Sequence, residues 1–460
     1  MESPFDIAAD LDTPVSAYLK LKPFEPRFLL ESVESGERLA RYSFVGLGAA
    51  LSLELYADRV ILDGETSPRP EGPGAWQALM RTTLARCPVL TPSIDGIPFD
   101  GGLVGATGYD VVRFFERLPA KASTRPDQPQ AAYVAPRSLL VFDHLTRRVA
   151  LLHSGPEAER QQLRREVIKA LRGPVDPAGN GTLAQSVPSI RRDDFLAAVA
   201  RAKHHIRLGD IYQIVLSVCF AGKSTLDPFQ VYRGLRLLNP SPYMYFFEHG
   251  TLRIAGSSPE ALVQLDHGHA ALRPIAGTRP RGADNEEDLA LETELLADPK
   301  ENAEHVMLVD LARNDLGRVA TGGSVHVNPY RRIERYSHVM HIVSGVRGEL
   351  AEGRDAFDLF AATFPAGTLV GAPKVRAMEL IAELEPVGRD LYGGTVGYFA
   401  KNGNMDQAIT IRTIVFNGED YSFQAGAGIV ADSDPAREHE EVLAKSAILR
   451  RALEIAEDGL

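Results

Sequence analysis

Two glutamate pairs repeat one spacing in distant parts of the chain. Glu301 and Glu304 lie in KENAEHVMLVD, and Glu438 and Glu441 lie in REHEEVLAKSA, where Lys445 follows one turn later. Residues three apart on a helix project from one face, and like charges there are mildly destabilising. Each pair alone is most simply a solvated acidic face. If the pairs faced each other across a cleft, a hard divalent cation such as Mg²⁺, which prefers carboxylate oxygens and water, would offset their repulsion.

An arginine and a glycine-rich segment point to an anion site. Arg412 lies in the apolar run QAITIRTIVF, which predicts a strand, and its guanidinium forms either a structural ion pair or a ligand contact. Arginine suits carboxylates because it can donate two parallel hydrogen bonds. Gly426 and Gly428 in FQAGAGIVADSDP either form a tight turn or leave backbone N–H groups open to an anion.

Three further segments hold candidate site residues. PIAGTRPRG, residues 274–282, has a constrained backbone around the small, inert Ala276. FPAGTLVGAPK lacks the spacing of a phosphate-binding P-loop and predicts a tight loop that leads into a helix, with Pro373 near its first turn. In RYSHVMHIVSG, His338 and His341 are three apart, but no HExxH pattern supports zinc, which leaves a polar histidine in a pocket.

Composition excludes several classes of protein. The 460 residues carry a net charge of −11, which argues against binding nucleic acid or an anionic membrane. No run of about 18 apolar residues predicts a transmembrane helix, and the N-terminus lacks a secretory signal pattern, so we expect a cytoplasmic protein. The two cysteines, Cys87 and Cys219, are far apart in the sequence and lie in apolar segments. This pattern predicts buried free thiols and not metal ligands.

The elements that would position these residues alternate irregularly. Residues 50–64 and 138–155 predict strands, the latter as a hairpin, and residues 391–430 predict strands joined by Asn-Gly turns. Helices are expected over residues 189–209, capped by Asp193 or Asp194, over 286–317 and over about 436–456. The pattern predicts an α+β fold with large antiparallel β-sheets and peripheral helices. A Pro/Gly-rich linker at 172–182 suggests an N-terminal part, 1–172, and a second part, 188–460.

Taken together, the segments resemble the chorismate-utilising enzymes over most of residues 188–460. The resemblance rests on GDIYQIVLS, GSSPE, PIAGTRPRG, KENAEHVMLVDLARNDLGR, FPAGTLVGAPK, DQAITIRT, AGAGIVADSDP and EHEEVLAKSAIL. It implies a two-sheet sandwich and is closest to the ammonia-using large subunits that form anthranilate. FDGGLVGATGYD is similar to the family's N-terminal element, with Ala106 where a tyrosine is common.

The resemblance implies a role for each candidate residue. Glu304 and Glu441 match direct Mg²⁺ ligands, and Glu301 and Glu438 match acids that complete the metal shell, partly through water. Glu260 matches a general acid for the departing C4 hydroxyl. The other matches are His341 and Thr368 in the active site, Gly277 and Thr278 in the pocket wall, Tyr392 and Arg412 at the ring carboxylate, and Gly426, Ala427, Gly428 and Lys445 around the substrate carboxylates.

Two positions distinguish the reactions of this family. Some members carry a lysine at the position of Ala276, where it attacks the ring, and others carry one at the position of Gln213, where it activates water. Without either lysine, the resemblance implies a lyase that aminates chorismate with ammonia and eliminates pyruvate to form anthranilate, the first step of tryptophan synthesis. The alternative is formation of 4-amino-4-deoxychorismate in the folate pathway, and a catalytically dead tryptophan-binding regulator is disfavoured because the acidic residues and Arg412 are present.

Partners and an effector also follow from the resemblance. Neither cysteine lies in the glycine-rich elbow of a glutaminase, so a separate glutamine amidotransferase subunit is implied, in a heterotetramer of two large and two small subunits. LLES and NPSPYMYF resemble the two walls of a tryptophan feedback site; core packing of an aromatic run is the alternative. The implied effector residues are Leu30, Glu31, Ser32, Asn239, Pro242, Tyr243, Met244 and Phe246.

Overall fold

A computed structural model describes residues 4–32, 41–119, 125, 127–177, 179, 181–335 and 339–460. His338 and most of the segment after Ser32 lie outside these residues. The described helices are α1 (Pro14–Lys20), η1 (Lys22–Phe24), α2 (Ala75–Arg86), η2 (Tyr109–Phe114), α3 (Glu157–Leu171), α4 (Arg192–Leu208), α5 (Pro228–Leu238), α6 (Asn285–Ala297), α7 (Pro299–Gly317), α8 (Ala356–Thr363), η3 (Gly367–Leu369), α9 (Lys374–Leu384) and α10 (Pro435–Asp458).

Within the described residues, 21 strands form one curled sheet and three form a second sheet. The large sheet contains β1 (Ile7–Ala8), β2 (Pro26–Glu31), β3 (Tyr42–Leu55), β4 (Arg59–Leu62), β5 (Glu65–Pro68), β6 (Gly102–Thr107), β7 (Ala131–Asp143), β8 (Arg148–His153), β9 (Val187–Pro188), β10 (Gln213–Lys223), β11 (Tyr243–His249), β12 (Leu252–Ser258), β13 (Ala261–Asp266), β14 (His269–Leu272), β16 (His326–Val327), β19 (Val346–Glu349), β20 (Gly371–Ala372), β21 (Thr395–Ala400), β22 (Met405–Ile409), β23 (Thr413–Asn417) and β24 (Asp420–Ile429). The small sheet contains β15 (Ile275–Pro280), β17 (Arg332–Arg335) and β18 (Val339–Val343).

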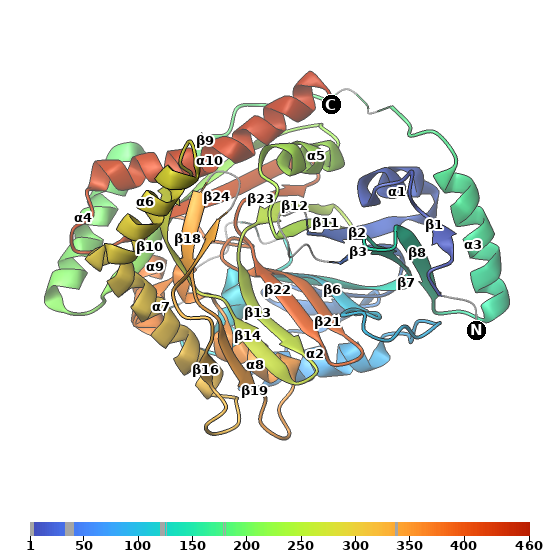
Figure 1. The fold of residues 1–460 in the computed structure, drawn as a ribbon, viewed down its shortest axis with the longest axis horizontal. Helices are drawn as coiled ribbons and strands as arrows, with labels where there is room; N and C mark the ends of the chain where they lie inside the picture. The colour runs from blue at the N-terminus through green and yellow to red at the C-terminus, as the bar shows by residue number, and fades with distance from the viewer. Residues whose placement is uncertain are drawn as a thin grey trace.

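Strands from both ends of the chain pair in the large sheet. β2 pairs antiparallel with β11, and β6 pairs antiparallel with β21, so the N-terminal strands continue the sheet of the C-terminal ones. Figure 1 shows the blue β2 next to the green β11, and the cyan β6 next to the orange-red β21. The prediction of an α+β fold with large antiparallel sheets is confirmed. The division of the chain near residues 172–188 stays a prediction, and the large sheet contains strands from both sides of it.

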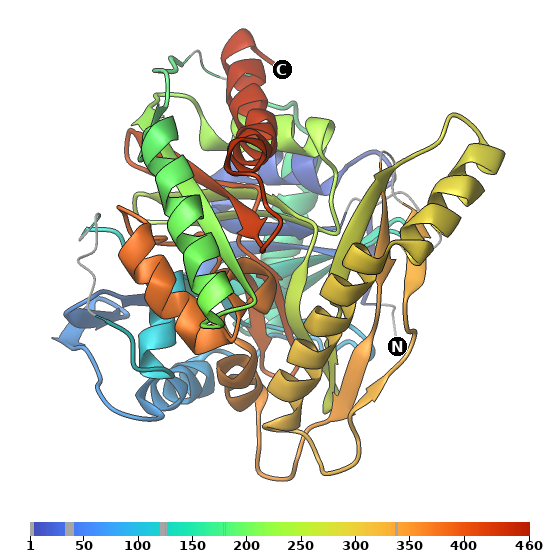
Figure 2. The ribbon, with the colours of Figure 1, turned by 90° about the vertical axis from the view of Figure 1, so that its left-hand side faces the viewer.

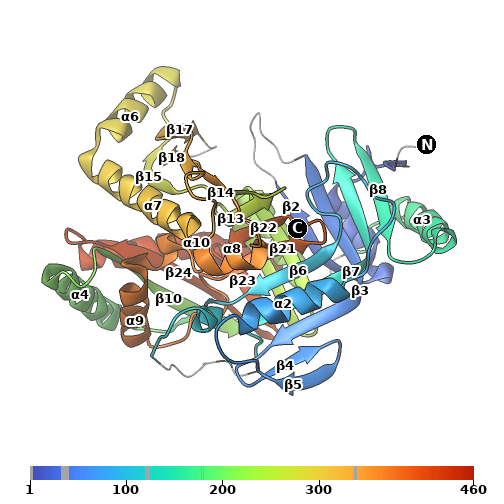
Figure 3. The same ribbon diagram turned by 90° about the horizontal axis from the view of Figure 1, so that it is seen from below.

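Each face of the curled sheet packs into a different hydrophobic core. On β11, Met244 and Phe246 belong to the core under the helices, whereas Tyr245 and Phe247 belong to a second core inside the curl. This alternation is the period of two expected of a strand that is buried on both faces. The helices α5 and α10 cover one side of the sheet (Figure 1), and α2 and α8 cover another (Figure 3).

The small sheet and α6 form a projection from the body. Leu295 of α6 packs with Met340 and Ile342 of β18 in a hydrophobic cluster separate from the two main cores. Figure 2 shows α6 in yellow extending outward beside these strands. The strand β15 connects the projection to the body, and it carries most of the PIAGTRPRG segment.

Three local expectations differ from the structure. Neither Asp193 nor Asp194 caps α4: the helix begins one residue earlier, and Asp194 binds Arg191 at its N-cap at 2.8 Å instead. The predicted helix over 286–317 is two helices, because Asp298 is extended and Pro299 starts α7. Arg412 lies between β22 and β23 in a left-handed conformation, with φ of 50°, rather than inside a continuous strand.

Candidate active site

A cavity of about 430 Å³ gathers most of the predicted site residues. Its walls come from β10, β15, η3, β24 and the facing helices α7 and α10. Its lining includes the predicted residues Glu260, Gly277, Thr278, Glu301, Glu304, Thr368, Tyr392, Arg412, Gly426, Gly428, Glu438, Glu441 and Lys445, together with Ala276 and Gln213. Segments more than 200 residues apart in the sequence therefore meet in one place, as the spacing of the two acid pairs suggested.

The acid pairs lie on separate helices, with α7 carrying Glu301 and Glu304, and α10 carrying Glu438 and Glu441. Burial raises the pKa of Glu304, and the negative charge of Glu301 raises it further. Burial also raises the pKa of Glu438, and Glu441 adds to that shift. The carboxylates therefore repel one another within a common cavity, which is the condition under which a cation would bind favourably.

Basic side chains hold two of these acids. Lys445 Nζ lies 2.5 Å from Glu441 Oε1 and 3.1 Å from the Gly426 carbonyl oxygen. Glu301 Oε1 lies 3.5 Å from Arg279 Nη1. In the part of the chain that the structure describes, no three Asp, Glu, His or Cys side chains stand close enough together to hold a metal ion without moving. The four carboxylates are nevertheless the hard oxygen donors that Mg²⁺ prefers.

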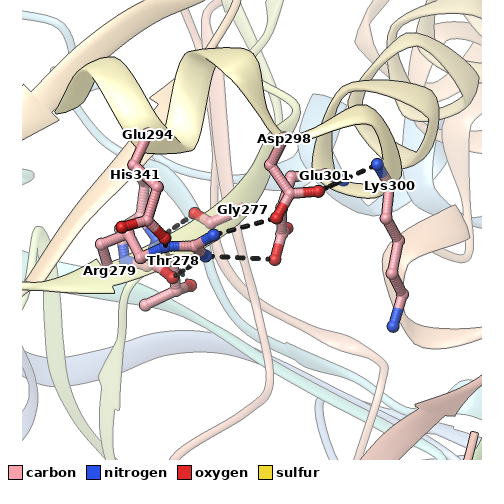
Figure 4. Close-up of polar contacts among 8 residues, drawn as sticks. All are labelled: Gly277, Thr278, Arg279, Glu294, Asp298, Lys300, Glu301 and His341. Atoms are coloured by element: carbon pink, nitrogen blue, oxygen red, sulfur yellow. Dashed lines mark hydrogen bonds and ion pairs between the residues drawn. The ribbon is translucent and has the colours of Figure 1, made fainter. Parts of the chain in front are cut away.

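Arg279 connects β15 to both neighbouring helices (Figure 4). Its Nε donates to Glu294 of α6 and its Nη2 donates to Asp298, each at 2.9 Å. Asp298 is also the N-cap of α7, accepting from the backbone N–H groups of Lys300 and Glu301 at 2.9 and 3.2 Å. Arg279 therefore fixes the helix start from which Glu301 projects.

The half-buried Glu260 places its carboxyl group beside Thr368. Thr368 Oγ1 donates to Glu260 Oε1 at 3.0 Å, which connects β12 and its following turn to η3. Burial raises the pKa of Glu260 to about 7, although the Thr368 hydrogen bond opposes the shift. An acid with this pKa is half protonated near neutral pH and is suited to proton transfer.

Arg412 points into the cavity from its left-handed position. Its Nη1 donates to the Lys445 carbonyl oxygen at 2.6 Å, and burial lowers its pKa. Across the described residues, no carboxylate forms an ion pair with Arg412, which favours the ligand contact over the structural ion pair. The nearby Tyr392 is also buried, and burial raises its pKa to about 12, so it stays a neutral hydrogen-bonding group.

The two glycines of the β24 segment make room for neighbouring side chains. A Cβ at Gly426 would lie 2.7 Å from the Tyr392 hydroxyl, and one at Gly428 would lie 2.9 Å from Gln213 Nε2. The methyl group of Ala427, between them, is fully buried in the core and does not line the cavity. Only the backbone of Ala427 remains a candidate for substrate contact.

His341 supports the wall from behind. Its Nδ1 lies 3.0 Å from the Gly277 carbonyl oxygen and 3.1 Å from Thr278 Oγ1, and it is not among the lining residues (Figure 4). A carbonyl oxygen can only accept, so Nδ1 carries the proton. Burial lowers the pKa of His341, which favours the neutral ring.

A second cavity of about 490 Å³ contains most of the predicted effector residues. Leu30, Glu31 and Ser32 form one wall, and Pro242, Tyr243 and Met244 form another. The pairing of β2 with β11, in which Met244 lies opposite Glu31, brings these two walls together.

Three predicted effector residues have other contacts. Phe246 packs in the core, 5.1 Å from the ring of Phe229, and does not line the cavity. Asn239 caps the end of α5, and its Nδ2 donates to Ser257 Oγ at 3.0 Å. Glu31 lines the cavity, but its carboxylate already accepts from Tyr232 at 2.5 Å and lies 3.3 Å from Arg236 Nε.

Sequence reasoning missed several lining residues. Lys300 and Gln424 line the first cavity, and Asp406 lines the second. Burial raises the pKa of Asp406 to about 7. Lys300 directly precedes Glu301, and Asp406 lies in the same DQAITIR run as Arg412, so proximity to the motifs was the only signal that the sequence offered.

The fold belongs to a known class of enzyme. The family model described as chorismate binding enzyme matches residues 25–451, and the chain belongs to that family. Within it, the chain groups with anthranilate synthase component I. A protein of that name from Pseudomonas aeruginosa is 46% identical over 475 residues, which cover 99% of this chain and 96% of its own length.

Two further relatives agree. Anthranilate synthase component 1 of Thermus thermophilus is 46% identical, with 98% of this chain and 97% of the relative covered. The crystal structure of anthranilate synthase component I from Streptococcus pneumoniae TIGR4 superimposes with a TM-score of 0.78 at 33% identity, covering 96% of this chain and 99% of that one. The prediction of an enzyme that uses chorismate is therefore confirmed, and a lyase fits the names of these relatives.

Proposed function

We propose that the chain forms anthranilate from chorismate and ammonia, with loss of pyruvate, in a Mg²⁺-dependent reaction. The observation that carries the proposal is the single cavity in which both acid pairs, Glu260 and Arg412 meet. Relatives named anthranilate synthase component 1 support the same product. The pathway would be tryptophan synthesis, in the cytoplasm. None of the described helices is both long and apolar enough to cross a membrane.

The lining residues suit the charges of the substrate. Arg412 and Tyr392 would hold the ring carboxylate. Lys445, which contacts Glu441, would lie near the substrate carboxylates. Mg²⁺ would be held by Glu304 and Glu441 directly and by Glu301 and Glu438 partly through water, and when bound it would stabilise the substrate's negative charge. Glu260 would donate the proton that the departing C4 hydroxyl needs, because hydroxide is a poor leaving group.

Ammonia itself would be the nucleophile. Ala276 is 8% exposed, and it places a methyl group, not an amine, in the cavity wall. Gln213, at the other position that distinguishes the reactions, donates from Nε2 to Glu304 at 3.3 Å. Neither side chain is a nucleophile or a strong base, so the chain's own residues would bind and orient chorismate while ammonia attacks C2.

The ammonia would come from a second subunit. The name component 1 in the relatives implies a partner component. We propose that this partner is a glutamine amidotransferase, in an assembly of two large and two small subunits. Burial raises the pKa of Cys87 to about 12 and that of Cys219 to about 11, so neither is a reactive thiolate of the kind that glutamine hydrolysis requires.

Tryptophan would inhibit from the second cavity. Pro242, Tyr243 and Met244 offer an apolar wall for an indole ring, and Ser32 offers a hydroxyl for its polar end. Because Glu31 is already paired, we assign the ligand's ammonium group to backbone carbonyl groups and Asp406 in preference to Glu31.

One assay tests the proposed reaction. Purified chain is incubated with chorismate, ammonium and Mg²⁺, and the amine that forms is identified by mass spectrometry and fluorescence. We expect anthranilate with ammonium, and no product when glutamine replaces ammonium and no partner is present. Formation of 4-amino-4-deoxychorismate would support the folate-pathway alternative instead, and glutamine use by the chain alone would refute the need for a partner.

A further inference from the structure

A buried ion pair contacts several of the residues that line the first cavity. Glu385 ends α9 and is 5% exposed, and Arg389, four residues later, is 3% exposed. The guanidinium donates from Nε and Nη2 to the two carboxylate oxygens of Glu385, at 2.9 and 2.7 Å. Desolvating two such charges costs several kcal/mol for each ion, so net stability alone does not account for the pair.

The remaining donors of Arg389 reach two separate walls of the cavity. Nη1 donates at 2.7 Å to the carbonyl oxygen of Leu369, which follows Thr368 in η3. Nη2 donates at 2.8 Å to the carbonyl oxygen of Val215 on β10. The guanidinium also lies 5.6 Å from the ring centroid of Tyr392. Leu369, Val215 and Tyr392 all line the cavity, whereas Arg389 does not.

Glu385 extends the network to a further wall. Its Oε1 accepts from the backbone N–H and the hydroxyl of Ser217 at 2.9 and 2.6 Å. The Ser217 hydroxyl in turn accepts from Gln424 Nε2 at 2.8 Å, and Gln424 of β24 also lines the cavity. One buried pair therefore connects β10, β24, η3 and the segment that holds Tyr392.

We propose that Glu385 and Arg389 are positioning residues, which set the distances between Tyr392, Thr368 and β10 around the bound substrate. The inference rests on the proposed function, because it takes this cavity as the chorismate site. A planar guanidinium with donors in fixed directions can hold three acceptors in one arrangement, which a lysine cannot do. Orientation matters because a displacement of about 1 Å can cost about a hundredfold in rate.

Two variants of the pair test the proposal. Arg389→Lys keeps the positive charge but loses the planar set of guanidinium donors. The double variant Glu385→Leu/Arg389→Met removes both charges and leaves no unpaired ion buried, but it also removes the hydrogen bonds to Ser217, Leu369 and Val215. Circular dichroism and urea unfolding therefore accompany the kinetics of both variants. We expect each to fold and to lower kcat/KM for chorismate by about tenfold to a hundredfold, through a lower kcat together with a higher KM.

The ion pair of Lys374 and Asp315 serves as the matched control. It is mostly shielded from solvent, with a contact of 2.7 Å and side-chain exposures of 13% and 11%, and neither residue lines the first cavity. Lys374→Met should lower the free energy of unfolding and leave the KM for chorismate unchanged. If the Glu385 and Arg389 variants change stability but keep the wild-type KM and kcat, the pair is only structural and the proposal fails.

Hydrogen exchange without substrate separates this proposal from the proposed function. Amides of residues 366–372 and 390–394 should exchange faster in both pair variants. Only residues 390–394 serve for comparison with Lys374→Met, where their exchange should not change, because Lys374 adjoins the first segment and Asp315 shares a small pocket with Thr368. Unchanged exchange in the pair variants would overturn the positioning role even if the enzyme is active. If exchange is faster in the variants but the wild type makes no anthranilate, the proposed function fails and the positioning role stands.

Discussion

At the scale of single residues, the proposed reaction assigns the proton transfer to Glu260. The carboxyl group titrates near pH 7 because it is buried, and the hydrogen bond from Thr368 is too weak an opposing effect to restore the ordinary value. A general acid works best when its pKa lies near the operating pH. Because burial disfavours the ionised carboxylate, the same raised pKa that would suit Glu260 to proton transfer lowers the stability of the fold when the group is deprotonated.

Glu260→Gln should abolish most turnover and stabilise the fold above neutral pH. The pKa of Glu260 is raised from 4.5 to about 7 in the folded chain, so the folded state binds the extra proton and loses stability as the pH rises between those values. That difference corresponds to at most about 3 kcal/mol. Urea unfolding at pH 5 and pH 8 measures it.

The exposed Glu419 provides the control for this measurement. Glu419→Gln should change the free energy of unfolding equally little at both pH values. A Glu260→Gln variant whose stability relative to wild type is the same at pH 5 and pH 8 would contradict the raised pKa.

At the scale of elements, β15 and α7 meet at a glycine. Gly277 has φ of 69°, and a Cβ there would lie 3.0 Å from Leu295 Cδ1 and 3.2 Å from Glu301 Oε2. The strand can therefore pass close to the acidic helix only without a side chain at this position. Arg279, two residues further along β15, fixes the start of the same helix through Asp298.

Gly277→Ala should weaken metal binding as well as stability. It places a methyl group against the Glu301 carboxylate and strains the backbone, whereas Gly403→Ala has a similar φ of 90° and nothing within 4 Å of the added Cβ. Both variants should lose roughly 1 kcal/mol or more of stability. Only Gly277→Ala should raise the Mg²⁺ concentration needed for half-maximal activity, and equal requirements in both would argue against contact with the metal shell.

The elements also show what the sequence could and could not predict. The spacing of Glu301 and Glu304 was enough to predict one helix face, because helical geometry is local. The interruption of the helix at Asp298 was not predicted from the sequence. Pro299 is a helix-starting residue, but the residues on both sides are strong helix formers and predict one continuous helix. The left-handed Arg412 escaped prediction as well, since its position depends on the turn between two strands and not on its own propensity.

The whole molecule places the two cavities back to back. Pro259 and Ile275 line both of them, and these residues are the neighbours of Glu260 and Ala276. A ligand in the second cavity would therefore contact the segments that carry Glu260, the proposed general acid, and Ala276. Sequence alone could not reveal this, nor the buried Arg389 network, because both depend on contacts between strands far apart in the chain.

Ser32→Phe should abolish inhibition by tryptophan and leave ammonia-dependent synthesis intact. Ser32 lines only the second cavity, and a phenyl group would fill part of the space for the indole ring. Allosteric coupling is typically about 1–3 kcal/mol and is reciprocal, so chorismate should weaken tryptophan binding to the wild type by the same factor. Inhibition curves at subsaturating chorismate and calorimetry of tryptophan binding measure the two effects.

Ser67→Phe, on the exposed strand β5, controls for the added ring and should stay sensitive to tryptophan. Full sensitivity of Ser32→Phe would place the effector site elsewhere. A wild type that tryptophan does not inhibit would remove the feedback assignment and favour the folate-pathway alternative.

The most direct test concerns the two acid pairs, because their meeting in one cavity is the basis of the proposed reaction. Anthranilate formation from chorismate and ammonium is followed while Mg²⁺ is titrated into wild type, Glu304→Gln, Glu441→Gln and the control Glu440→Gln, whose exposed side chain lies next to Glu441 on α10. We expect wild type and Glu440→Gln to depend on Mg²⁺ alike, and the other two variants to lose about a hundredfold or more of activity at saturating Mg²⁺ while remaining folded. Normal turnover in Glu304→Gln or Glu441→Gln, or full activity of wild type after chelation of Mg²⁺, would contradict the account.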